Sequence, residues 1–194
     1  MAVDHVKSTP ITELDATPIV RQTGGQGGPE KLKTVEGFVT IVASSSADAT
    51  YQVVRVPFDA IIKKIIVDAE AFTTTGQFDV GVYYATDGSN QLSASSLLAA
   101  DAIDQDFFTI TALDGGEANG LYAVLTPGGG FRITNATVAQ DDNTVWDYAD
   151  VHIPLWEALG LTTNPGGNAD ICLTITEANG AGTPVVGLQV EYTD

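Results

Sequence analysis

The chain ends in the stretch DICLTITEANGAGTPVVGLQVEYTD, residues 170–194, and this stretch decides the fold class. Large apolar residues alternate with other residues in two runs: Ile171, Leu173 and Ile175, then Leu188, Val190 and Tyr192. An alternation of period 2 places each set on one face of a β-strand. Between the runs, residues 179–184 read NGAGTP, which supplies the glycine of a tight turn. The pattern predicts two strands joined by a hairpin-type loop.

Four more strands are predicted upstream, over residues 38–42, 51–56, 61–67 and 78–84. The run at 61–67 is rich in β-branched residues, and its length favours a strand over a helix. The first of these runs is apolar on both faces, which is typical of a strand in the middle of a sandwich. Pro57 ends the second run, because proline cannot donate a hydrogen bond to a neighbouring strand.

Helical patterns are few and short in this sequence. Residues 92–100 are rich in Ala, Leu and Ser, and residues 154–159 begin with a proline and stop at Gly160. Many short strands, frequent glycine turns and one or two short helices predict an all-β fold, an antiparallel β-sandwich that is jelly-roll-like and carries an extended N-terminal arm.

Charge divides the 194 residues into two parts. The chain has 25 acidic and 8 basic side chains and a net charge of −17. Residues 1–34 contain four of each, and residues 35–194 therefore hold 21 acidic and 4 basic side chains. The first part also contains three prolines and the run GGQGG at 24–28. We therefore expect residues 1–34 to form an extended N-terminal arm that lies on a neighbouring subunit, or alternatively on its own body, and residues 35–194 to form the β-sandwich body.

The same charge excludes several classes of partner. Binding to nucleic acid needs clustered Lys and Arg, which the body lacks, and an anionic membrane surface would repel it. No stretch approaches the ~18 apolar residues of a membrane span, and the N-terminus lacks the pattern of a signal peptide. We expect no nucleic acid and no membrane as partners, and synthesis in a cytoplasm.

Residues with catalytic or metal-binding chemistry are sparse. The single cysteine, Cys172, lies in an apolar run and is interpreted as a small buried hydrophobe. The two histidines, His5 and His152, lack the spacing of a metal pair. The sequence therefore predicts no catalytic residue, no cofactor-binding residue and no metal ligand, and a protein that is not an enzyme.

Carboxylates are the one abundant reactive group. They cluster in three places: Asp101, Asp104 and Asp106; Asp141 and Asp142; and Asp114 with Glu117. We interpret these as solvated acidic loops, with a Ca²⁺ site as the alternative, because no segment matches a Ca²⁺-binding loop. Three aromatic residues, Trp146, Tyr148 and Trp156, could line a carbohydrate cleft, but a role in the core is the favoured interpretation.

Residues 155–171, LWEALGLTTNPGGNADI, resemble a pattern LWxxLGLxxDPGGxxDI of small β-rich proteins encoded beside the major capsid protein in tailed bacteriophages. Asn164 stands where that pattern has Asp. Residues 51–57, YQVVRVP, with the strand at 61–67, residues 78–83, FDVGVY, and the ending 187–192 are similar to the same family. The family consists of capsid decoration (cement) and auxiliary head proteins.

This resemblance implies a virion structural protein on the exterior of the capsid. It would bind and stabilise the outer surface of the shell, with the major capsid protein as its partner through residues 1–34, as a homo-oligomer for which a trimer is favoured. The family pattern supplies no catalytic residue. Three alternatives remain open: a receptor- or carbohydrate-binding module that uses the Trp and Tyr loops, a head–tail or tail component of the same virion, and an enzyme that uses His152.

Overall fold

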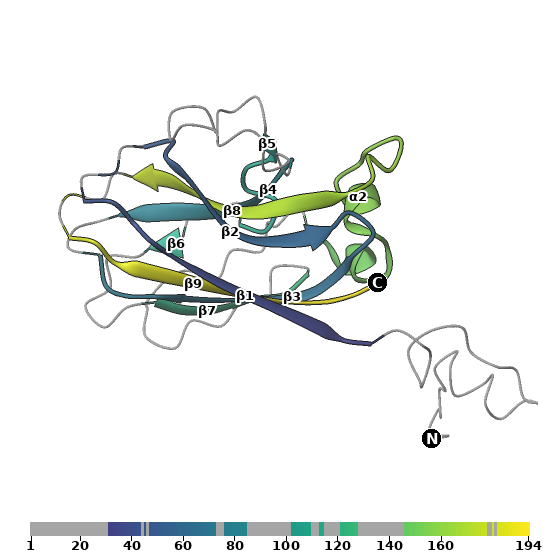
Figure 1. Ribbon diagram of the computed structural model, residues 1–194, viewed down its shortest axis with the longest axis horizontal. Helices are drawn as coiled ribbons and strands as arrows, with labels where there is room; N and C mark the ends of the chain where they lie inside the picture. Colours follow the sequence, from purple (N-terminus) through teal and green to yellow (C-terminus); the bar gives the residue numbers. More distant parts are fainter. Residues whose placement is uncertain are drawn as a thin grey trace, which may run out of the picture. The chain divides into compact units, whose positions relative to one another are not determined.

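Nine β-strands form two facing sheets in the residues that the structure, a computed structural model, describes (Figure 1). These residues are 31–43, 45, 47–72, 76–84, 102–109, 113–114, 121–127, 146–177, 180 and 182–194. The strands are β1 (Lys33–Thr40), β2 (Thr50–Pro57), β3 (Ile61–Ala69), β4 (Gln77–Tyr84), β5 (Ala102–Asp104), β6 (Leu113–Asp114), β7 (Leu121–Leu125), β8 (Asn168–Glu177) and β9 (Val185–Thr193). The predicted helix at 92–100 and residues 1–30 of the predicted arm lie outside the described residues.

The strand order is that of a jelly roll. Sheet A has the order β1-β9-β3-β7, and sheet B has the order β2-β8-β4-β5, with β6 also paired to β4. Every pairing is antiparallel. The chain passes between the layers repeatedly, since β1, β3, β7 and β9 belong to sheet A and the strands between them to sheet B. The predicted all-β sandwich is confirmed.

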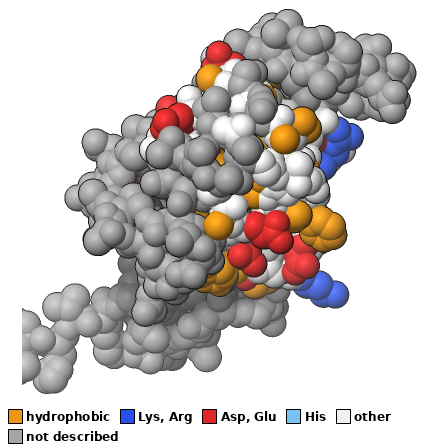
Figure 2. Space-filling model, turned by 90° about the vertical axis from the view of Figure 1, so that its left-hand side faces the viewer, with side chains coloured by type: hydrophobic (Ala, Val, Ile, Leu, Met, Phe, Trp, Pro, Cys, Tyr) orange, Lys and Arg blue, Asp and Glu red, His pale blue; other side chains and the backbone are white. Residues whose placement is uncertain are grey.

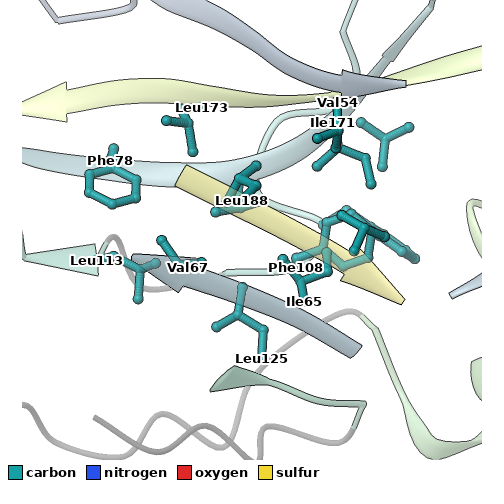
Figure 3. Close-up of a cluster of buried hydrophobic side chains, with 14 of the residues drawn as sticks. Val54, Ile65, Val67, Phe78, Phe108, Leu113, Leu125, Ile171, Leu173 and Leu188 are labelled. Atoms are coloured by element: carbon teal, nitrogen blue, oxygen red, sulfur yellow. The ribbon is translucent and has the colours of Figure 1, made fainter. Parts of the chain in front are cut away.

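The core lies between the two sheets. Figure 3 shows Phe78, Ile171 and Leu173 of sheet B directed toward Val67 and Leu188 of sheet A. All five side chains are at most 2% exposed. Burial of each such side chain favours folding by about 1.5–3 kcal/mol, which makes this layer the main source of stability.

The predicted hairpin between the last two strands is wrong. β8 lies in sheet B and pairs with β2 and β4, whereas β9 lies in sheet A and pairs with β1 and β3. The residues between β8 and β9 therefore connect the two layers. Alternating apolar residues specify which face of a strand is buried, and both strands obey that rule, but the alternation carries no information about which strand pairs with which.

The first strand also differs from its prediction as a central strand over 38–42. β1 runs from Lys33 to Thr40 and lies at one end of sheet A, with β9 as its partner among the described strands. Phe38 is 79% exposed and Val42 63% exposed. Apolar residues on both faces fit a central strand in general, but here the outward residues form part of an exposed surface.

The inward face of β1 makes an unusually close contact with sheet B. A side-chain carbon placed on Gly37 would lie 2.2 Å from the carbonyl oxygen of Val53. Val53 lies at the irregularity in β2 where the pairing with β8 skips a residue, between Gln52 and Val54. A bulge of this kind redirects the backbone, and glycine is the residue that leaves room for it.

Two short helices follow one another before β8. The 3₁₀ helix η1 covers Tyr148–His152, and α2 covers Leu155–Ala158. Pro154 precedes α2 in an extended conformation, at the N-cap position, and Gly160 follows the helix with a φ of 69°. The predicted helix over 154–159 is confirmed, with both its proline start and its glycine stop. No helix within the described ranges is long and apolar enough to cross a membrane.

Candidate functional site

The two segments that resemble the phage family meet at an ion pair. β2 and β8 align Arg55 with Asp170. The Arg55 Nε donates to Asp170 Oδ1 at 2.5 Å, a terminal Arg55 nitrogen donates to Oδ2 at 2.9 Å, and Gln52 donates to Oδ2 at 3.0 Å. The Asp170 side chain is 3% exposed and that of Arg55 is 44% exposed. A two-pronged contact of this kind fixes the register of two strands, so these motif residues have a structural role.

The remainder of the 155–171 motif folds against the turn after β2. The backbone N–H of Leu155 donates to the carbonyl of Ala60 at 2.8 Å, and that of Phe58 donates to the carbonyl of Gly167 at 3.1 Å. These bonds hold the segments 58–60 and 155–167 together. The two segments that resemble the phage family, 51–57 and 155–171, therefore belong to one folding unit.

The two side-chain contacts of Asn164 explain why this chain has an amide where the family pattern has Asp. Its side-chain oxygen accepts from the Gly166 N–H at 2.7 Å, as an Asp oxygen would. Its side-chain nitrogen donates to Asp59 Oδ1 at 2.6 Å. An aspartate here would face a second carboxylate, so the amide suits the neighbour that this chain carries.

One of the predicted acidic clusters is brought against β4. Asp104 lies opposite Val82, and the Asp106 N–H donates to Asp104 Oδ1 at 3.3 Å. The backbone passes so close that a side-chain carbon on Gly81 would lie 2.1 Å from the carbonyl oxygen of Gln105. This segment also covers Asp79, which the sequence analysis did not single out.

Asp79 is the described carboxylate whose pKa is raised furthest. Burial, and secondarily the charge of Asp106, raises the pKa of Asp79 to about 7, although a hydrogen bond with Thr109 opposes the rise. Its Oδ1 is buried with no hydrogen-bond partner among the described residues. Burial, followed by contact with Asp106, also raises the pKa of Asp104 to about 6. Asp79 and Asp104 therefore keep their protons to a higher pH than an exposed aspartate does.

A metal site requires more ligands than this cluster brings together. Within the described residues, no three His, Cys, Asp or Glu side chains gather as a metal ion would need. Asp101, Asp141, Asp142 and Glu117, together with the side chain of Asp114, lie outside the described residues. The cation alternative therefore gains no support from Asp104 and Asp106.

Cys172 is buried, whereas His152 is exposed to solvent. Cys172 is fully buried, as predicted, and burial raises the pKa of its thiol far above the usual range, with a further rise from Asp170 that Arg55 opposes. Such a thiol is a poor nucleophile. His152 is exposed at the end of η1, and His5 lies outside the described residues.

The three aromatic residues considered for carbohydrate binding separate in the structure. Trp146 is 1% exposed and contacts Phe108 edge-to-face with ring centres 5.0 Å apart. Trp156 is half-buried against the core, and only Tyr148 is largely exposed, at 68%. The favoured core interpretation is confirmed for the two tryptophans, whereas Tyr148 lies at the surface.

A different surface combines exposed aromatic and acidic side chains, on the outer face of sheet A. Phe38, Gly187, Asp68 and Tyr122 lie opposite one another on β1, β9, β3 and β7. Two adjoining hollows of about 260 and 300 Å³ lie along this row and share Phe38, Asp68 and Gly187. We call them the sheet A groove; its remaining lining residues are Glu36, Gly37, Ile66, Glu70, Tyr122, Val185, Leu188 and Gln189.

The sequence contained a partial signal for this groove. Gly187 interrupts the outward positions of β9 and leaves the floor open between two aromatic residues. Detecting it required the order β1-β9-β3-β7, which local patterns do not specify. Acidic side chains also lie beside exposed apolar ones on the end of the sandwich seen in Figure 2.

Comparisons with known proteins find a similarity in structure but none in sequence. No protein-family model matches the chain, and no curated protein matches it. A chain from the capsid of Ralstonia phage GP4 has a TM-score of 0.50 over 89% of this chain and 90% of its own length, at 12% identity. This sandwich is a fold found in a phage capsid. A chain of the cyanophage Pam1 capsid asymmetric unit aligns over 92% of this chain and 96% of its own, at 13% identity and a TM-score of 0.43.

Proposed function

We propose that this chain is a virion structural protein that binds and stabilises the outer surface of a phage capsid as a decoration (cement) protein. The observation that carries the proposal is the fold it shares, over about nine-tenths of both chains, with a chain of the Ralstonia phage GP4 capsid. The motif resemblance points to the same role, and its two segments belong to one folding unit, since Arg55 and Asp170, one from each segment, form a single contact.

The proposed partner is the major capsid protein, held through residues 1–34 of a homo-oligomer, with a trimer favoured. Contacts that are weak singly become strong when repeated over a shell. The acidic body suits a position that faces solvent, since like charges keep free copies apart before assembly. The role is non-enzymatic and needs neither nucleic acid nor membrane; the protein is made in the host cytoplasm and works on the capsid exterior.

Deletion of residues 2–30 tests the role of the arm. β1 begins at Lys33, whose side chain pairs with Asp194, so the deletion leaves this strand and its ion pair intact. We expect the full chain to sediment with capsids that lack it and the deleted chain to remain in the supernatant. A chain with residues 2–30 in permuted order is the matched control, because it keeps composition and charge. Equal loading of the deleted chain would overturn the arm's role.

Copy number tests the decoration role itself. Decoration of a shell requires hundreds of copies per particle, whereas a head–tail or tail component is present in a few copies at one vertex. Quantitative mass spectrometry of purified particles distinguishes the two. A few copies per particle would overturn decoration and favour the tail alternative.

A further inference from the structure

The sheet A groove is built as a channel with two aromatic walls. Phe38, 79% exposed, stands on β1, and Tyr122, 40% exposed, stands on β7. Three strand spacings separate them, about 14 Å between backbones. Gly187 and Asp68 form the floor between the walls, where the glycine contributes no side chain. The width leaves room for one extended polypeptide chain, which itself needs about 5 Å in one direction and about 10 Å in the other.

The charge of the groove has one sign. Glu36, Asp68 and Glu70 line it, and no basic side chain does so among the described residues. Glu36 accepts from Gln189 at 2.9 Å and Glu70 accepts from the Val185 N–H at 2.9 Å, and neither donor neutralises charge. The Asp68 carboxylate has no partner among the described residues and is exposed.

The nearest basic side chain along the floor is already engaged. Lys64 lies on β3 two positions before Ile66 and pairs with Glu191 at 2.7 Å. It therefore offers no charge to Asp68. The groove is complementary to a ligand that brings its own positive charge on an apolar stem.

We propose that the sheet A groove binds an extended segment of a partner protein by an arginine or lysine side chain, which lies over Gly187, pairs with Asp68 and packs against Phe38 or Tyr122. Ion pairing to a carboxylate and contact with an aromatic face are the two interactions that such side chains combine. The proposal rests on the proposed function only for the identity of the partner, which would be the capsid surface.

A peptide titration tests the groove without capsids. The probe is the acetylated and amidated peptide Gly-Ser-Val-Arg-Val-Ser-Gly, and its matched control carries citrulline, which keeps the shape of arginine and removes its charge. Both are titrated into the isotopically labelled full chain and followed by NMR. We expect the arginine peptide to shift the amides of Asp68 and Gly187, and the citrulline peptide to bind about fivefold more weakly.

Variants assign the binding to the groove. Asp68→Asn should weaken the arginine peptide about fivefold and leave the citrulline peptide unchanged, and Phe38→Ala should weaken both. Both sites are exposed, so the fold is retained. Glu157→Gln and Tyr148→Ala remove an exposed charge and an exposed ring from the helices and should change neither affinity.

Several outcomes would overturn the proposal. They are equal binding of the two peptides, shifts that map away from the groove, shifts induced by oligosaccharides and not by the arginine peptide, and a change in oligomeric state in Phe38→Ala. If the arginine peptide does not bind but the full chain still loads onto capsids, the proposal for this groove is wrong and the proposed function is unaffected. If the arginine peptide binds but the full chain does not load onto capsids, the groove proposal is supported and the capsid is excluded as the partner.

Discussion

At the scale of single residues, Asp79 should make the stability of the fold depend on pH. Its pKa is about 7 in the folded chain against a usual 3.8, mainly because it is buried. An unfolded chain releases this proton near pH 4, while the folded chain holds it to about pH 7. The contribution to stability is therefore complete below pH 4 and is lost as the pH rises through 7.

Asp79→Asn removes this loss, because the amide stays neutral at every pH. After allowance for solvent screening, the gain should be about 1–2 kcal/mol above pH 8, or about 2–8 °C in Tm. Thermal unfolding from pH 5 to pH 9 measures it, with a Tm difference between variant and wild type that widens as the pH rises. Glu157→Gln, on exposed α2, is the control and should show no widening. A constant difference for Asp79→Asn contradicts the prediction.

At the scale of elements, Gly37 should be required where β1 meets β2. A side-chain carbon on Gly37 would lie 2.2 Å from the Val53 carbonyl oxygen, a backbone atom that cannot rotate away. Gly37→Ala should therefore cost about 1–3 kcal/mol, measured by denaturant unfolding. Gly187→Ala is the matched control in the same sheet, since the nearest atom to its new carbon is 3.7 Å away. Equal stability of the two variants would contradict this account.

Elements were predictable from sequence where their signal is local. The strands at 51–56 and 78–84 were found because each carries its own alternation, and the strand at 61–67 because it is rich in β-branched residues. The helix α2 was found because Pro154 and Gly160 bracket it. Partner choice is non-local, and so the hairpin of β8 with β9 was wrong. The same limit hid the candidate groove, whose row of residues comes from four strands, and hid Asp79, which is buried by a segment about 25 residues further along the chain.

At the scale of the whole molecule, the uneven charge predicts how salt acts on stability. Residues 1–30 carry a net charge of −2, so residues 31–194 retain −15 of the total −17. Among the described residues the basic side chains Lys33, Arg55 and Lys64 each pair with a carboxylate. The remaining carboxylates repel one another in the folded body more than in an expanded chain.

Added NaCl should therefore raise the Tm of this protein by several degrees between 10 and 200 mM, because the screening length falls from about 30 Å to about 7 Å. The rise should be the same after deletion of residues 2–30, since almost all of the repulsion resides in the body. Scanning calorimetry of both chains at pH 7.5 measures the two slopes. A fall in Tm with salt would show that attractive ion pairs outweigh repulsion in the folded protein. A rise that disappears with the deletion would show that residues 1–30, and not the β-sandwich, control the response to charge.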